Sequence, residues 1–131
     1  MKIHAVLSTL LCLLTAHASF AADTLTLAKP DGSIVQIYTT ADAPPPVVFA
    51  SQELQHYLQQ ITGRTVDVIH ELPADSAQPV IILGDTPATR EAGIDPSNYV
   101  RDEFTLAIKG SRLFVVGKDD DLQVTLPKGK G

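Results

Sequence analysis

The segment PPPVVFASQELQHYLQQITG, residues 44 to 63, decides the fold of this chain. Its apolar side chains recur at three- and four-residue spacing, which places them on one face of an α-helix, and its glutamines and His56 fall on the opposite face. The three prolines end any preceding strand, and Gly63 stands where a left-handed residue closes a helix. This pattern predicts a helix over residues 47–62. The face predicted to meet the core consists of Val47, Ala50, Leu54, Tyr57, Leu58 and Ile61.

Two pairs of short apolar runs, one on each side of this helix, predict β-hairpins. Residues 24–27 and 34–38 are rich in β-forming side chains, and the Asp-Gly pair between them is a strong turn signal. Residues 104–108 and 113–116 flank Lys109-Gly110-Ser111 in the same way. Both hairpins would contribute antiparallel strands to one sheet.

Two further strands and a short helix complete the predicted elements. Residues 65–69 alternate between apolar and polar side chains, and residues 80–83 form a fully apolar run that ends at Gly84. Thr86-Pro87 is typical of a helix cap followed by a first-turn proline and predicts a short helix over about residues 86–92. The fold class is therefore α+β. We expect a small mixed or antiparallel sheet with the long and the short helix packed on it, or a mixed sheet with helices on one face.

Length and charge exclude several functions. The chain has 131 residues, enough for one ordinary domain, whereas a (β/α)8 barrel needs roughly 250. Acidic residues outnumber basic ones by 15 to 10, which gives a net charge of −5. An acidic chain without a basic stripe argues against nucleic acid and against an anionic membrane surface as partners.

Residues 1–21 have the pattern of a secretory signal peptide. A positively charged start precedes an apolar run at residues 5–14, and small residues permit cleavage after Ala18 or Ala21. The run is shorter than the roughly 20 residues that a membrane span needs. The mature chain is therefore predicted to be secreted or periplasmic. Cleavage would remove Cys12, the single cysteine, and with it any disulfide or cysteine-bound metal.

The mature chain divides into a domain over residues 22–121 and a short, atypical tail over residues 122–131. The tail ends in Pro-Lys-Gly-Lys-Gly, which has no strand or helix pattern. One long helix leaves much of one face of the sheet uncovered. Such a face predicts either a partner protein or a chain that is a shortened version of a larger one.

Three stretches of the domain resemble the N-terminal domain of alpha-glucuronidases and related exported glycoside hydrolases, which has the β-hexosaminidase domain 2-like fold. The stretches are residues 50–63 (ASQELQHYLQQITG), residues 79–84 (PVIILG) and residues 102–120, from DEFTL to VGKDD. Their order and spacing match over roughly residues 24–121. After residue 121 the chain departs from the family pattern, which continues with a second amphipathic helix and then the barrel.

The resemblance implies an exported, non-catalytic accessory domain, associated with the degradation of xylan-type polysaccharides and truncated before the catalytic barrel. In this family the domain precedes the barrel and packs against it, and the catalytic carboxylates lie in the barrel. No catalytic residue is therefore carried over, and no cofactor is expected. The expected partner is a catalytic barrel or another protein surface. Two alternatives remain: a free-standing carbohydrate-binding module, and a small interaction domain unrelated to sugars.

Two patterns could bind a metal ion. Glu53 and His56 have the carboxylate-x-x-histidine spacing of helical metal sites, but His56 is expected to point away from the apolar stripe into water. Asp119-Asp120-Asp121 offers hard oxygens for calcium, without the glycine and the distal glutamate of a calcium-binding loop. We predict a solvated helix face and a solvated turn, and hence no metal.

Two other groupings could support acid–base chemistry or anion binding. His70 and Glu71 close a strand beside Asp67, but they need a pocket to perturb their pKa values. Gly84-Asp85-Thr86 follows a strand and could present amides to a phosphate, although it has the pattern of an ordinary capped turn. No serine lies in a Gly-x-Ser-x-Gly elbow.

Sugar binding usually relies on aromatic platforms, and this chain has no tryptophan. Periodicity predicts that Tyr57, Phe104 and Phe114 belong to the core. The aromatic residues left to contact a sugar in the mature chain are Tyr38, Phe49 and Tyr99.

Overall fold

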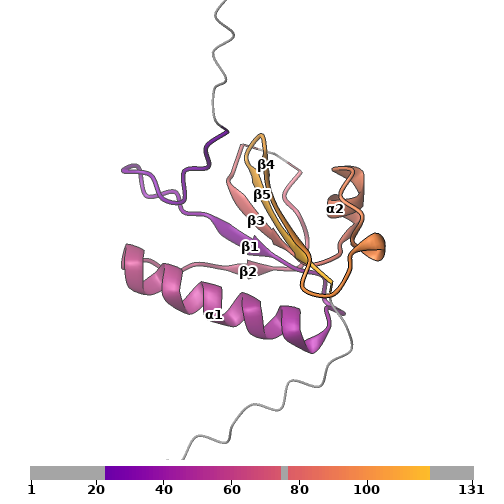
Figure 1. Cartoon of the computed structure of the whole chain (residues 1–131). Coiled ribbons are helices and arrows are strands. Elements are labelled where there is room, and N and C mark those ends of the chain that lie inside the picture. Colours follow the sequence, from indigo (N-terminus) through magenta and orange to yellow (C-terminus); the bar gives the residue numbers. More distant parts are fainter. Residues whose placement is uncertain (1–22, 75–76, 119–131) are drawn as a thin grey trace, which may run out of the picture.

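The computed structural model of the chain describes residues 23–74 and 77–118. The predicted signal peptide at residues 1–21 and the tail at residues 122–131 lie outside the described residues. Within them the chain forms a five-stranded sheet and two helices, one long and one short, which confirms the predicted fold class (Figure 1). The strands are β1 (Gln36–Tyr38), β2 (Val68–Ile69), β3 (Val80–Leu83), β4 (Phe104–Lys109) and β5 (Arg112–Gly117).

The sheet is mixed, in the order β2-β1-β3-β5-β4. β1 pairs in parallel with both β2 and β3, and β3 pairs in parallel with β5, whereas β4 and β5 form an antiparallel hairpin. The side chains of β3 are all buried, as expected for a central parallel strand that has apolar side chains on both faces. Because side chains alternate along a strand, Ile81 and Ile82 enter two different hydrophobic clusters, one on each face of the sheet.

The long helix α1 (Pro45–Thr62) packs on one face of the sheet. It starts two residues before its predicted first residue, because a proline in the first helical turn loses no intrahelical hydrogen bond. Gly63 ends it with φ of 66°, and the Gly63 N–H donates to the Gln59 carbonyl at 2.8 Å, as the sequence predicted. Val47 and Leu58 belong to one hydrophobic cluster with the buried strand residue Ile37.

The predicted core-facing stripe of α1 is partly wrong. Ala50 is exposed, Tyr57 is 55% exposed and Ile61 is 80% exposed, whereas Ser51 is buried. The helix is thus rotated about its axis relative to the predicted orientation. The side chain of Gln55 explains this rotation, because its amide donates to the Val66 carbonyl at 2.7 Å. This contact holds the Gln55 flank of the helix toward β2 and turns the opposite flank away from the core.

The short helix α2 (Pro87–Glu91) and the one-turn 3-10 helix η1 (Pro96–Asn98) lie on the other face. Thr86 caps α2 by accepting a hydrogen bond from the Thr89 N–H at 3.1 Å, which confirms the predicted cap. Ala88 of α2 packs in one cluster with Phe114 of β5. α1 and α2 therefore cover opposite faces of the sheet, and the alternative with helices on one face is wrong.

The two predicted hairpins differ in extent. β4 and β5 pair over their full length, from Phe104 opposite Gly117 to Lys109 opposite Arg112. In the first hairpin the turn forms, but residues 24–27 are not a strand, and the pairing is one isolated bridge between residues 28 and 34. The strand predicted over residues 65–69 is reduced to β2. β1 takes β2 and β3 as its neighbours in the sheet, and residues 24–27 do not pair with it as a strand.

Candidate functional site

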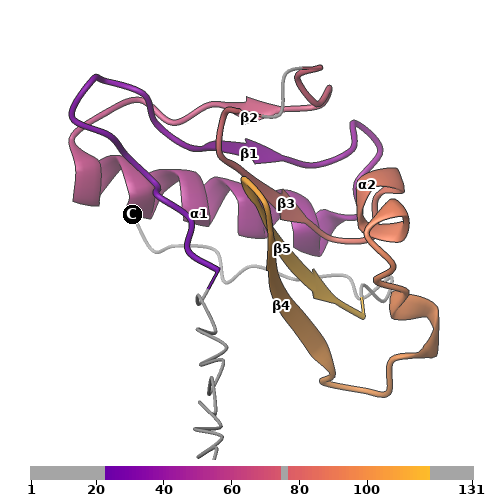
Figure 2. The same ribbon diagram turned by 90° about the horizontal axis from the view of Figure 1, so that it is seen from above.

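The most prominent surface of the described domain is an apolar sheet face that α1 leaves uncovered. In the view from above, β4 and β5 extend beyond the part of the sheet that α1 covers (Figure 2). Phe104 and Leu106 are 67% and 61% exposed on this side of the sheet. We define the open face as the five residues that alternate toward this side: Phe104, Leu106 and Ile108 of β4 with Leu113 and Val115 of β5.

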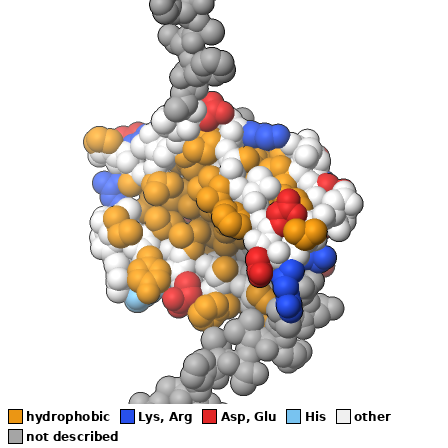
Figure 3. All heavy atoms as spheres, viewed as in Figure 1, with side chains coloured by type: hydrophobic (Ala, Val, Ile, Leu, Met, Phe, Trp, Pro, Cys, Tyr) orange, Lys and Arg blue, Asp and Glu red, His pale blue; other side chains and the backbone are white. Residues whose placement is uncertain are grey.

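The exposed flank of α1 forms the rim of the open face. Gln55 holds one flank of the helix toward β2, the edge strand farthest from β4. Tyr57 is two residues further along and therefore lies nearly on the opposite side of the helix, toward β5 and β4, and Ile61 lies one turn beyond it. Figure 3, seen from the same side as Figure 1, shows the hydrophobic side chains as a broad patch over the sheet and α1.

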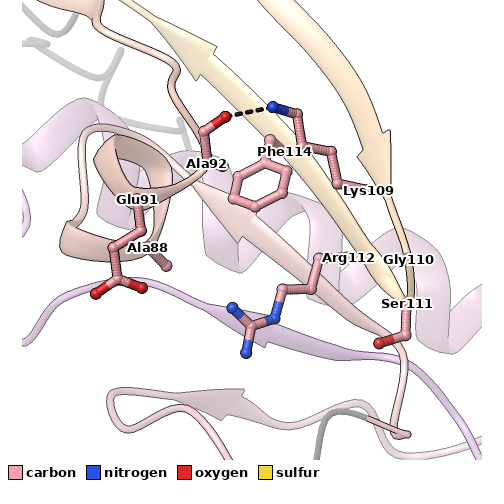
Figure 4. Close-up of a pocket in the computed structure, with 8 residues that line it drawn as sticks. All are labelled: Ala88, Glu91, Ala92, Lys109, Gly110, Ser111, Arg112 and Phe114. Carbon is pink, nitrogen blue, oxygen red and sulfur yellow. Dashed lines mark hydrogen bonds between the residues drawn. The ribbon is translucent and has the colours of Figure 1, made fainter.

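A hollow with both charged and apolar lining residues lies on the other face, between α2 and the turn of the β4–β5 hairpin (Figure 4). It has a volume of about 400 Å³, and Phe114 contributes to its apolar wall. Glu91 projects from α2, whereas Lys109 and Arg112 come from the two strands of the hairpin. Lys109 Nζ donates to the Ala92 carbonyl.

Arg112 gives this hollow its binding capacity. Among residues 23–74 and 77–118 its guanidinium has neither an ion pair nor a hydrogen bond. A guanidinium presents paired N–H donors that match a carboxylate in two-point geometry. The hollow can therefore accept a small anionic group beside an apolar wall.

The carboxyl ends of the parallel strands, where open α/β sheets usually bind ligands, are engaged by contacts within the chain. After β1, the Thr39 carbonyl accepts a hydrogen bond from His70 Nδ1 at 2.9 Å. After β3, the Gly84 carbonyl accepts from Thr89 Oγ1 at 2.9 Å. Asp85 accepts hydrogen bonds from the Arg90 guanidinium, and this contact raises the pKa of Arg90 above its usual value.

One polar atom near this edge is unsatisfied. Thr39 is buried, and within the part of the chain that the structure describes its hydroxyl has no hydrogen-bond partner. Burying such a hydroxyl without a partner costs about 1–3 kcal/mol.

Thr39→Val is therefore expected to stabilise the fold by up to about 1–2 kcal/mol, since a methyl group of similar size replaces the unpaired hydroxyl. Urea unfolding followed by circular dichroism measures the change. The matched control is Thr89→Val, which leaves the Gly84 carbonyl without its donor and is expected to destabilise by about 1–3 kcal/mol. A loss of stability in Thr39→Val would contradict the prediction.

Of the two sequence patterns that could bind a metal ion, the structure describes only Glu53 with His56. Both Glu53 and His56 are exposed, and His56 Nε2 lies 2.9 Å from the Gln60 amide nitrogen. In the described residues, no group of three or more His, Cys, Asp or Glu side chains is arranged to hold a metal ion. The run at residues 119–121 lies outside the described residues.

The acid–base candidates lie at exposed positions of the structure. His70 is occupied by the Thr39 carbonyl, and both Asp67 and Glu71 are exposed. The capped turn at residues 84–86 is confirmed, because the Thr86 hydroxyl accepts a hydrogen bond from the Thr89 N–H in the first turn of α2.

The aromatic residues are distributed differently from the prediction. Tyr38 is buried and offers no platform, and the Tyr99 hydroxyl is hydrogen-bonded to the Thr105 hydroxyl. Phe114 is a core residue, as predicted, but Tyr57 and Phe104 are exposed. The sequence predicted that part of the sheet lacks cover, because one long helix cannot cover five strands, but it did not identify the residues that form the open face.

Among the described residues, neither helix combines the length and the hydropathy that crossing a membrane requires. Searches of protein-family models, curated proteins and solved structures found no match to this chain. The resemblance to the alpha-glucuronidase N-terminal domain stays a prediction.

Proposed function

We propose that this chain is an exported, non-catalytic accessory domain that packs its open face against a catalytic module of the alpha-glucuronidase type. The observation that carries the proposal is the open face itself, where large apolar side chains such as Phe104 and Leu106 are more than half exposed. Contiguous exposed apolar surface of this kind is typical of protein interfaces. The sequence resemblance supports the choice of a catalytic barrel as partner.

The role of the accessory domain in this proposal is to support the barrel. The open face offers apolar contacts and few charged groups, so its contribution is desolvation and shape rather than proton transfer. The resemblance places the carboxylates for glycosidic cleavage in the barrel. Export follows from the predicted signal peptide, and the associated substrate class is xylan-type polysaccharide.

Binding to an alpha-glucuronidase barrel that lacks its own N-terminal domain tests this proposal. We expect the chain to bind, and Tyr57→Lys with Ile61→Lys to weaken binding by roughly tenfold or more, since two charges are placed on the rim of the open face. The matched control is Gln52→Lys with Gln60→Lys, which changes exposed polar positions of the same helix. Absence of binding, or equal weakening by both pairs, would contradict the proposal. So would turnover of glucuronoxylan fragments or aryl glycosides by the chain alone.

A second candidate function is a carbohydrate-binding module for acidic sugars. The observation that favours it is the hollow beside α2, where Arg112 can pair with a uronate carboxylate next to an apolar wall. Titration with glucuronate oligosaccharides followed by NMR separates the two functions. Saturable shifts around the hollow that Arg112→Gln abolishes would favour this second function.

A further inference from the structure

The outer edge of β4 is defined by the way its neighbour β5 is bonded. The Val80 N–H of β3 donates to the Ser111 carbonyl at 3.0 Å, and the Gly84 N–H donates to the Val115 carbonyl at 3.0 Å. In this parallel pair, odd-numbered residues of β5 thus turn their backbone groups toward β3. Successive residues of a strand alternate in the direction of their backbone groups, so the even-numbered residues of β5 face β4.

The antiparallel register carries this alternation across to β4. Even-numbered residues of β5 lie opposite odd-numbered residues of β4, as Phe114 lies opposite Ala107. The odd-numbered residues of β4 therefore bond to β5, and Phe104, Leu106 and Ile108 direct their N–H and C=O groups away from the sheet. β4 is the last strand in the sheet order, so in the described part of the chain no further strand pairs with these groups.

This edge lacks the features that usually prevent strands from pairing between molecules. The sequence FTLAIK of β4 contains no proline, forms a regular register with β5 throughout, and carries its single charge at the end. Natural edge strands are normally blocked by prolines, bulges or inward-pointing charges. An open six-residue edge with exposed apolar side chains is suited to pair with another strand.

We propose that two copies of this chain pair along β4, antiparallel, with Leu106 of each copy opposite Leu106 of the other. A two-fold axis perpendicular to the sheet requires each side chain to oppose one on the same face. In this register the residues whose backbone groups point away from the sheet pair with one another, and Phe104 lies opposite Ile108 of the second copy. Each of these pairs exchanges backbone hydrogen bonds and buries apolar side chains of the open face.

Charge complementarity selects the second copy and this register. Glu103 lies three residues before Leu106, and Lys109 lies three residues after it. The two-fold axis thus places Glu103 of each copy opposite Lys109 of the other, which is favourable across antiparallel strands. A shift by two residues in either direction separates these charges. Glu103 accepts from the Val100 N–H and Lys109 donates to the Ala92 carbonyl, but each retains further capacity for an ion pair.

The pairing goes beyond the proposed function, because it uses the edge of β4 rather than the face that would pack against a barrel. The perpendicular axis keeps both open faces on the same side of one continuous sheet. The two faces then adjoin, with an α1 helix on each outer flank. A dimer would therefore present a wider apolar surface, formed by two open faces, to any partner.

Analytical ultracentrifugation of the full chain with charge variants tests the pairing. We expect a concentration-dependent dimer, weakened roughly tenfold by Glu103→Lys or by Lys109→Glu, because each change opposes like charges at two symmetric positions. The double variant Glu103→Lys with Lys109→Glu restores opposite charges and is expected to return the dissociation constant to near the original value. A monomer at about 100 μM would overturn the proposal. A dimer that both single variants leave unchanged, or that the double variant does not rescue, would overturn it equally.

Cysteine cross-linking provides a measurement that does not depend on charge. In the Cys12→Ser background, Leu106→Cys places one thiol on the axis, where the Cα atoms of a bonded antiparallel pair lie about 5.5 Å apart, within disulfide range. Mild oxidation is expected to give a covalent dimer. Ile61→Cys, on exposed helix surface away from the edge, is the matched control and should remain largely monomeric. Equal cross-linking of the two variants, or none at residue 106, would overturn the register.

Discussion

Phe114→Ala is expected to destabilise the domain by about 3–5 kcal/mol, which is a large part of the total stability of a domain of this size. Phe114 is 2% exposed and is the largest of the fully buried side chains. It lies in the centre of β5 and contacts the cluster beneath α2, so its removal leaves a cavity between the sheet and the short helix. Urea unfolding followed by circular dichroism measures the loss.

The matched control for this prediction is Phe104→Ala in the same hairpin. Phe104 is 67% exposed, so its truncation removes little buried area and is expected to change stability by less than about 1 kcal/mol. Comparable losses in the two variants would mean that the two phenylalanines are equally buried. That result would contradict both the packing of the hairpin and the open face.

Leu58→Ala is expected to destabilise the domain by about 2–5 kcal/mol. Leu58 is 5% exposed and belongs to the cluster in which α1 meets the sheet, together with Val47 and Ile37. An alanine at this position leaves a cavity beneath the helix, and α1 depends on this contact because tertiary packing rather than intrinsic propensity stabilises most helices. The midpoint of urea unfolding reports the change.

Ile61→Ala is the matched control on the same helix. Ile61 is 80% exposed, and alanine is the better helix former, so its truncation is expected to alter stability by less than about 0.5 kcal/mol. The sequence pattern alone assigns Leu58 and Ile61 to one apolar face. Similar losses at both positions would favour that pattern over the rotated helix in the structure.

The candidate site is a case in which sequence patterns carried little information. The hollow beside α2 depends on Glu91 and Arg112, which are far apart in the sequence and belong to no common motif. The residue sets that do form patterns, such as Glu53 with His56, are exposed in the structure. A pattern identifies residues at helical or strand spacing, but a site depends on which elements the fold brings together.

The open face is a second feature that sequence periodicity predicts only in part. The composition and the single long helix predict that part of the sheet lacks cover, and the structure locates that part over β4 and β5. Periodicity assigned Phe104 to the core, because apolar alternation is identical for a covered and an uncovered strand face. Only the position of α1 relative to the strands distinguishes the two.

The amino-acid sequence by itself determined the elements whose hydrogen bonds close within a few residues: the end of α1 at Gly63, the Thr86 cap of α2 and the β4–β5 hairpin. The tertiary structure decided the parallel pairing of β1, the flank of α1 that is buried and the strands that α1 leaves open. The physical reason is that these features depend on contacts between segments distant in the chain, such as Gln55 with Val66 or β3 with β5. Local propensity is the same for each alternative arrangement, so burial and hydrogen bonding summed over the whole fold select one of them.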